Sequence, residues 1–516
     1  MKCGDMLFRI MTIITLAFLL CWGAAMVIYT IKPFWRDEWC LIYNLKFKPP
    51  KMLWGPLDFT QQFPRVYLQC IKFFSAQLGY SYCSLRFPSY LAGTGAVFLC
   101  YNLMNRLFAE NGSVKFLFLF IVVAHPVFID YFVQIKQYEM EILLCLVALW
   151  QLLELLRLRD KRLPINIRYL FLCASFLVVP FFSYTYPIAI APVFFVLFLH
   201  DFLNFKNRNS INYLKQNLPY LWMPLIISLA SIGVFYAIDI SQLMGDKDMY
   251  GWWSGFLITH ETTWKTIIEK MWLFFAKAGA GFVFEIIFGI LSIISFGYAA
   301  YFSIKRLDAR EYSRDLWVML YSVTLILLVF GLYFAGKLPL GQPRFNIFTI
   351  PSVAILIVFL IATLQKTYPF KKFAAVLIVI LFIALTGNIY TACLNLYISD
   401  EYRTDRKIYW ATEDAINFAR KNKMPILVTP AVGFPDDITL VMTHLSMPTA
   451  AGILKTLPAY KVDDTIAIYT IKDLKEVTES KRLLAPGVKF VVAGDGLSYK
   501  VFRLISCTVS QSPSFH

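Results

Sequence analysis

The chain has 516 residues, of which 58% are hydrophobic and 17% aromatic, and it carries a formal net charge of +16. Apolar segments of membrane-spanning length recur through the first three quarters of the chain, which excludes a single soluble domain. Basic residues lie in short gaps between the apolar runs, so they indicate membrane orientation rather than binding to nucleic acid. The ten cysteines form no CxxC motif and no cluster with histidine, and therefore predict neither a zinc site nor a disulfide framework.

About eleven apolar runs are long enough to cross a bilayer as helices, which predicts an all-α polytopic membrane protein. They lie near 8–31, 85–108, 115–134, 140–157, 168–184, 186–204, 217–239, 279–304, 315–336, 344–365 and 372–393. The first run is longer than the apolar core of an ordinary signal peptide, so we expect a retained span. The runs at 168–184 and 186–204 require a very tight turn around Tyr184 and Pro187.

Lysine and arginine are unequally divided between the two sets of gaps. With a cytoplasmic N-terminus, the cytoplasmic gaps hold Arg106, Lys115, Arg157, Arg159, Lys161, Arg162, Arg168, Lys206, Arg208, Lys215, Lys305, Arg306, Arg310, Arg314, Lys366, Lys371 and Lys372. The short gaps on the other side hold only Lys136, Lys337 and Arg344. The positive-inside rule thus predicts a cytoplasmic N-terminus and an extracytoplasmic C-terminal part, and we expect a bacterial inner-membrane location.

The predicted domains are a transmembrane domain over 1–397 and a small soluble domain over 398–516. Within the first, an extracytoplasmic loop at 32–84 contains an amphipathic stretch, Pro64–Tyr80, that predicts interfacial helices, and 240–278 forms a second long loop. After 398, a charged helical stretch (405–421) precedes strand-like segments at 425–429, 465–470 and 488–492. The pattern indicates an extracytoplasmic α/β domain without a phosphate-binding loop or catalytic motif of its own.

Two adjacent carboxylates, Asp37 and Glu38, follow the first apolar run. Ionised groups are costly in hydrocarbon, so a carboxylate pair at that boundary, flanked by Trp35 and Trp39, is expected to have a function. Such a pair could act as a general base or hold a divalent cation, although no third ligand lies near it in the sequence. The alternative is a solvated acidic turn beside interfacial aromatic residues.

The predicted topology places further polar residues on the same extracytoplasmic side. Candidate phosphate-binding residues are Lys136, Lys337 and Arg344, and candidate substrate-binding residues are Tyr138, Glu139, His260, Glu261 and Gln342. Arginine binds phosphate through a planar fork and lysine as a point charge, so an acid with a phosphate clamp suits a lipid-phosphate-linked substrate. Each assignment has an alternative: cations that anchor helix ends, a glutamate that begins a helix, and a histidine that bonds only its loop neighbours.

Five short motifs occur in order along residues 8–393. They are Trp35-Arg36-Asp37-Glu38, Phe63-Pro64-Arg65-Val66-Tyr67-Leu68, Leu85-Arg86-Phe87-Pro88-Ser89, Lys136-Gln137-Tyr138-Glu139 and Pro343-Arg344-Phe345. In this set the chain resembles the membrane glycosyltransferases of the GT-C fold, especially the protein O-mannosyltransferase and aminoarabinose transferase group. Two positions depart from that pattern: Gln62-Phe63 replaces a histidine before the proline, and Gln137 stands where a proline is common.

The resemblance implies transfer of a sugar from a polyprenyl-monophosphate donor to a hydroxyl group of a protein, lipid or glycan acceptor outside the cytoplasm. On this hypothesis Asp37 is the general base of an inverting reaction, and Glu38 supports it or helps to hold a divalent cation. Arg344, Lys136 and Lys337 bind the donor phosphate. Two other functions remain open: a transporter or flippase of lipid-linked saccharides, and a glycan ligase or polymerase that uses diphosphate-linked donors.

Overall fold

The fold is given by a computed structural model, which describes most of the helical part of the chain. The described residues are 3–28, 34, 36–58, 61–78, 82–108, 112–160, 166–208, 211–241, 256–259, 262–276, 282–340, 342–367, 369–398, 426–428, 460–463, 466–470, 489–493, 499–505 and 508–511. The chain divides into two compact units. The first comprises Met1–Ile28, Phe63–Tyr67 and Arg86–Leu394, and the second comprises Tyr29–Gln62, Leu68–Leu85 and Asn395–His516.

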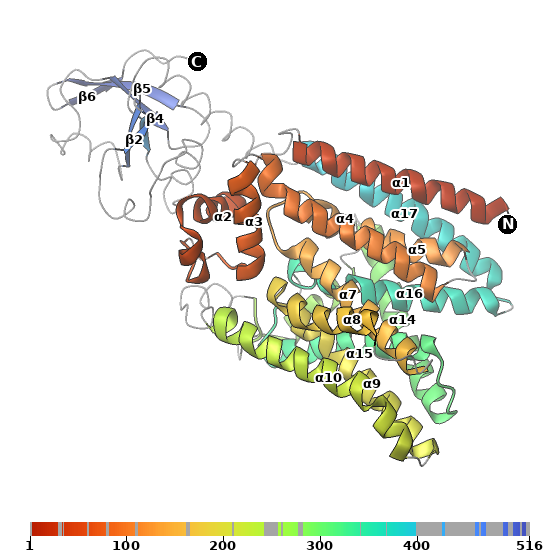
Figure 1. Cartoon of the computed structure of the whole chain (residues 1–516). Coiled ribbons are helices and arrows are strands. Elements are labelled where there is room, and N and C mark those ends of the chain that lie inside the picture. The colour runs from red at the N-terminus through yellow and green to blue at the C-terminus, as the bar shows by residue number, and fades with distance from the viewer. Residues whose placement is uncertain are drawn as a thin grey trace. The chain divides into compact units, whose positions relative to one another are not determined.

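Most of the described residues of the first unit are helical (Figure 1). In chain order the long α-helices are α1 (Cys3–Ile28), α4 (Tyr82–Leu107), α5 (Gly112–Val123), α7 (Tyr138–Asp160), α8 (Ile167–Val178), α9 (Tyr186–Arg208), α10 (Ile211–Phe235), α13 (Trp264–Ala276), α14 (Phe282–Asp308), α15 (Arg314–Phe334), α16 (Ile350–Lys366) and α17 (Lys371–Ile398). Shorter elements are α6 (Pro126–Tyr131), η3 (Val179–Phe182), the π-helical η4 (Tyr236–Ile240), η5 (Pro343–Phe345) and η6 (Ile347–Thr349). Each apolar run predicted from the sequence overlaps at least one helix among the described residues.

Six of the described helical segments are long and apolar enough to cross a membrane. They are Tyr186–Asn204, Pro219–Ile240, Glu285–Asp308, Arg314–Phe334, Ile347–Lys366 and Lys371–Thr391, and three shorter apolar segments occur at Thr12–Val27, Ser113–Val123 and Ile167–Phe182. The chain is therefore an integral membrane protein. The count of about eleven spans stays a prediction, since α4 and α7 do not belong to this set. Charged residues near both ends exclude α7, and polar residues lower the hydropathy of α4.

Two predicted runs form less regular helix than their composition suggests. The run at 115–134 was expected to be one helix, but α5 ends at Val123 and α6 begins at Pro126, with the His125 side chain accepting a hydrogen bond from the Val127 amide at 3.2 Å. Proline cannot donate within a helix but suits its first position, so it restarts the helix here. Similarly, the run at 344–365 begins with the short turns η5 and η6 before α16.

The predicted tight turn between α8 and α9 is confirmed. The helical segment before it ends at Phe182, and α9 begins at Tyr186. The Ser183 hydroxyl accepts hydrogen bonds from the amides of Thr185 and Tyr186, at 3.1 and 3.2 Å. This side chain satisfies amide groups at the start of α9 that have no partner within the helix.

Packing within the first unit joins helices that are distant in the sequence. Contacts link α5 with α16, α14 with α16, α7 with α9, α9 with α15, and α8 with α10. At one point the Phe132 ring fills the space left by two glycines: a Cβ at Gly23 would lie 2.3 Å from Cε1 of this ring, and one at Gly93 would lie 2.2 Å from Cδ2. The missing side chains therefore allow α1 and α4 to approach the segment after α6.

The second unit contains helices from the loop after the first apolar run and strands from the C-terminal part. α2 (Arg36–Phe47), η1 (Pro50–Trp54) and most of α3 (Arg65–Leu78) form its helical part, which confirms the predicted amphipathic helix near 64–80. Lys72 donates hydrogen bonds to the Leu45 and Lys48 carbonyl oxygens at the end of α2, the second at 2.8 Å. A cation is favourable at this end of a helix. Burial lowers the pKa of Lys72, and it lowers the pKa of Lys46 to about 8.

The described C-terminal strands form one six-stranded sheet. They are β1 (Ile426–Val428), β2 (Tyr460–Asp463), β3 (Ile466–Thr470), β4 (Lys489–Ala493), β5 (Tyr499–Ile505) and β6 (Thr508–Gln511), in the order β2-β3-β1-β4-β5-β6. The three strands predicted from the sequence are confirmed as β1, β3 and β4; β1 lies between the other two and pairs with both in parallel. The predicted helix at 405–421 lies outside the described residues, so the α/β domain over 398–516 stays a prediction.

Candidate functional site

The segment that leads into α7 carries three of the predicted site residues, and all three are buried. Lys136, Tyr138 and Glu139 have exposed fractions of 6%, 8% and 0%. The Lys136 carbonyl oxygen accepts a hydrogen bond from the Ser89 hydroxyl at 3.2 Å, and the Tyr67 hydroxyl lies 3.3 Å from the same Ser89 oxygen. The predicted motifs around Tyr67, Ser89 and Lys136 therefore meet at one place in the first unit.

Glu139 lies in the first turn of α7, and its carboxylate faces α4. A Cβ placed on Gly93 would lie 3.1 Å from its Oε2 atom, so the carboxylate packs against bare helix backbone. Neither carboxylate oxygen has a hydrogen-bond partner in the part of the chain that the structure describes. Burying an ionised carboxylate without a partner costs about several kcal/mol of folding free energy. The favourable interaction of a carboxylate with a helix start, about 0.3–1 kcal/mol, does not offset this cost.

The segment before α16 carries Gln342 and Arg344, both half-buried. The Gln342 carbonyl oxygen accepts hydrogen bonds from the Phe345 amide at 3.0 Å and from the Asn346 side chain at 3.4 Å. The Arg344 guanidinium lies 4.9 Å from the centre of the Phe345 ring. The turn η6, which follows Arg344, packs against α7, and Lys136 lies two residues before α7. The segments that carry Arg344 and Lys136 therefore adjoin elements that are in contact.

Lys337, the third predicted phosphate-binding residue, has a different environment. It is exposed in the turn after α15, where Gly336 has a φ of +63° and the Lys337 amide donates to the Leu332 carbonyl at 2.8 Å. The positive φ explains the glycine, because other residues rarely adopt it. The two remaining candidates on this side, His260 and Glu261, lie outside the described residues.

Asp37 and Glu38 occupy the first turn of α2, in the second unit. Carboxylates are favourable at this end of a helix because the unpaired amides there are partly positive. Consecutive helical residues point about 100° apart, and here Asp37 is half-buried while Glu38 is fully buried. No group of three or more His, Cys, Asp or Glu side chains that could hold a metal ion occurs among the described residues.

Sequence reasoning missed a buried cluster that joins three distant segments of the first unit. The Asp239 carboxylate accepts hydrogen bonds from the Arg65 amide and from the Tyr184 hydroxyl, both at 2.7 Å. The Arg65 Nε atom lies 3.9 Å from the same carboxylate, and both charged side chains are only 1% exposed. Nε and Nη1 of Arg65 make no hydrogen bond to any described residue.

The Arg65–Asp239–Tyr184 cluster lies at the end of the helices that holds the α7 entry. Tyr184 belongs to the turn before α9, and Thr185, the next residue, is hydrogen-bonded to the buried Glu141 carboxylate in the first turn of α7. Asp239 lies in η4, where the helix widens to π geometry, a feature that is frequent at functional sites. One sequence signal was available: Asp239 is an acidic residue at the very end of an apolar run.

Several solved structures are similar to this chain. ArnT from Cupriavidus metallidurans in the apo state has a TM-score of 0.48 and 11% identity, and the match covers 95% of this chain and 93% of that chain. The same protein bound to undecaprenyl phosphate has a TM-score of 0.47 and 10% identity over the same shares. Archaeal oligosaccharyltransferase AglB from Archaeoglobus fulgidus, in complex with an inhibitory peptide and a dolichol-phosphate, has a TM-score of 0.45 and 11% identity, covering 87% of this chain and 65% of that chain.

No protein-family model matches the chain, and no curated protein matches it either.

Proposed function

We propose that this chain is an integral-membrane glycosyltransferase that moves a sugar from a polyprenyl-monophosphate donor to a hydroxyl acceptor on the extracytoplasmic side. The observation that carries the proposal is the concentration of buried ionisable groups at one end of the first unit. Lys136, Glu139 and Glu141 at the start of α7 are joined there by the Arg65–Asp239 pair. Charges that are expensive to bury at a membrane boundary are typical of a reaction site rather than of a structural core.

The proposed reaction is a single displacement with inversion. Asp37 accepts the proton of the acceptor hydroxyl, whose oxygen then attacks the anomeric carbon of the sugar. The bond between that carbon and the phosphate oxygen breaks, and the polyprenyl phosphate leaves with one more negative charge than the donor carried. Glu38 supports Asp37 or helps to hold a divalent cation.

Arg344 and Lys136 have the task of stabilising the charge that develops on the leaving phosphate. Cations fixed in place before the reaction stabilise the transition state more than the ground state, because the phosphate charge grows as the bond breaks. The half-buried position of Arg344 and the burial of Lys136 support this role, since charge interactions are stronger away from water. Lys337 is exposed and contributes less in this proposal.

Purified protein offered a panel of lipid-linked monosaccharides, with product analysis, tests the function directly. Asp37→Asn should abolish transfer while the folded protein remains abundant, and Arg344→Gln should lower the rate by about a hundred- to a thousandfold. Arg314→Gln is the matched control, because Arg314 is an exposed arginine at the start of α15, in a gap predicted to be cytoplasmic. Full activity of Asp37→Asn would remove the base assignment, and failure of the wild-type protein with every monophosphate-linked donor would refute the function.

A further inference from the structure

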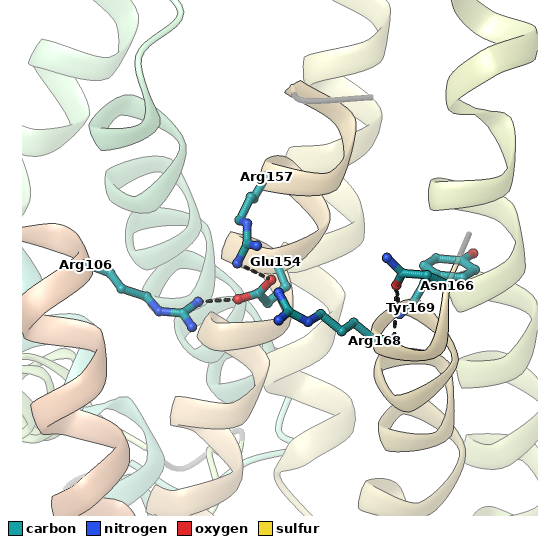
Figure 2. Close-up of polar contacts among 6 residues, drawn as sticks. All are labelled: Arg106, Glu154, Arg157, Asn166, Arg168 and Tyr169. Carbon is teal, nitrogen blue, oxygen red and sulfur yellow. Dashed lines mark hydrogen bonds and ion pairs between the residues drawn. The ribbon is translucent and has the colours of Figure 1, made fainter. Parts of the chain in front are cut away.

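A second group of charged residues lies at the opposite end of α4 and α7, away from the proposed transfer site. Glu154 in α7 forms ion pairs with Arg106 in the last turn of α4 and with Arg157 in the last turn of α7, the second at 3.4 Å (Figure 2). The two arginines pair with different oxygens of the carboxylate. Figure 2 shows the Arg168 side chain extending from α8 toward the same glutamate.

This cluster has more positive charge than it can neutralise. Arg106 and Arg157 pair with one carboxylate and Arg168 extends toward it, so these four side chains together carry three positive charges and one negative charge. Arg168 makes no ion pair with any residue that the structure describes, and Arg106 and Arg157 each use a single nitrogen for Glu154. A guanidinium has several N–H donors in a fixed fork, and such a fork matches the oxygens of a phosphate. The free donors are accessible, because the Arg106 and Arg157 side chains are 34% and 39% exposed.

The side chains around Arg168 hold its backbone in place. Asn166 caps α8 by accepting hydrogen bonds from the amides of Arg168 and Tyr169, at 3.0 and 3.3 Å (Figure 2). The Tyr169 hydroxyl donates to the Pro219 carbonyl oxygen of α10 at 2.7 Å, which anchors the same turn from its other side. Because its backbone is fixed by these contacts, Arg168 loses less conformational freedom when it binds a ligand than an arginine on a loop would.

An apolar surface adjoins the cluster. Ile167 and Phe171, on either side of Arg168 in α8, are 64% and 69% exposed. In a helix predicted to lie in the bilayer such side chains face lipid tails, while an arginine at the helix end reaches the headgroup level. An excess of positive charge beside an exposed apolar face fits a molecule with an anionic head and an apolar tail, and it fits a soluble anion poorly.

We propose that Arg106, Arg157 and Arg168 form a binding site for the headgroup phosphate of an anionic phospholipid in the leaflet at this end of the helices, which is the cytoplasmic leaflet in the predicted topology. Glu154 holds Arg106 and Arg157 at a fixed separation and offsets one positive charge. The lipid tails then lie along the exposed face of α8. Binding here involves no chemical step and is independent of sugar transfer.

Native mass spectrometry of the full chain, titrated with phosphatidylglycerol in a micelle of phosphatidylcholine and detergent, tests the site. Arg157→Gln and Arg168→Gln should each weaken phosphatidylglycerol binding about fivefold, and the double variant about twenty-fivefold, with phosphatidylcholine binding unchanged. Arg314→Gln is the control, because Arg314 is also an exposed arginine in the first turn of a capped helix, α15, with the Ser313 hydroxyl as its cap.

Three results would overturn the proposal. Unchanged affinity in the double variant would show that the lipid binds elsewhere. An equal loss in Arg314→Gln would show a general charge effect of the whole face rather than a site. Competition by inorganic phosphate at concentrations equal to those of the lipid would show a site for soluble anions. Folding of each variant is checked by its thermal unfolding in phosphatidylcholine micelles, where the lipid-free proteins should match.

Discussion

Replacement of Asp239 by asparagine should destabilise the first unit more than any surface substitution. The carboxylate accepts two hydrogen bonds of 2.7 Å and lies 3.9 Å from the Arg65 guanidinium, with both charged side chains almost completely buried. Asparagine has a single acceptor oxygen, so one of the two hydrogen bonds is lost. More importantly, the substitution leaves the Arg65 charge buried without its carboxylate.

The expected loss is about 3–5 kcal/mol of unfolding free energy, the usual cost of removing one partner from a buried ion pair. Tyr184→Phe removes only the hydrogen bond to the carboxylate and should cost about 1.5–3 kcal/mol. Glu311→Gln is the matched control, since Glu311 pairs with Arg306 at 3.7 Å but is 65% exposed. An exposed pair of this kind contributes below about 1 kcal/mol.

Unfolding by sodium dodecyl sulfate in mixed micelles, followed by far-ultraviolet circular dichroism, measures these differences. A double variant with apolar residues at both positions, Arg65→Met with Asp239→Leu, should be more stable than Asp239→Asn, because neither charge is then left alone. The coupling energy between the two positions should reach about 2 kcal/mol. A loss in Asp239→Asn no larger than that of Glu311→Gln, or strictly additive losses in the double variant, would refute the reasoning.

Two further predictions concern single side chains. Burial lowers the pKa of Lys46 from 10.5 to about 8, so between these pH values the unfolded chain binds more protons than the folded one. The stability of the wild-type protein should therefore rise with pH in this range, relative to Lys46→Met. Identical pH profiles of detergent-induced unfolding for the two proteins would contradict this. Gly93→Ala places a Cβ 2.2 Å from Cδ2 of Phe132 and should cost about 1–3 kcal/mol in the same assay, whereas Gly95→Ala, where the nearest atom is a Leu143 methyl at 3.4 Å, should be nearly neutral. Equal effects of the two alanines would show that the Phe132 contact is not responsible.

The helices could be predicted from the sequence because hydrocarbon imposes a simple rule: each span must be apolar over a fixed length. The rule fails where a polar backbone feature interrupts an apolar run. Composition alone did not show the break between α5 and α6, since His125 and Pro126 stand within an otherwise apolar segment. Similarly, the turn η6 before α16 is as apolar as the start of the helix that follows it.

The candidate site could be predicted only in part, for a reason of a different kind. Lys136, Glu139 and Arg344 were selected as candidates because they lie at the predicted extracytoplasmic ends of apolar runs and within the motifs that carry the resemblance. Asp239 and Arg65 are 174 positions apart, and each has an ordinary local explanation, as the end of a span and the start of an amphipathic helix. Their importance arises from burial against each other, which no pattern along the chain encodes.

The residues of the two proposals lie at opposite ends of α7. With 23 residues and a rise of about 1.5 Å each, the helix is roughly 35 Å long, somewhat more than the hydrocarbon thickness of about 30 Å. Glu139 and Glu141 are buried at its first turn, while Glu154 and Arg157, near its other end, keep partly exposed side chains. In the predicted topology one end faces the sugar donor and the other faces cytoplasmic headgroups. Exposed charges this far apart interact little, because the Debye length at physiological ionic strength is about 8 Å. A variant can therefore lose lipid binding and keep sugar transfer, or the reverse.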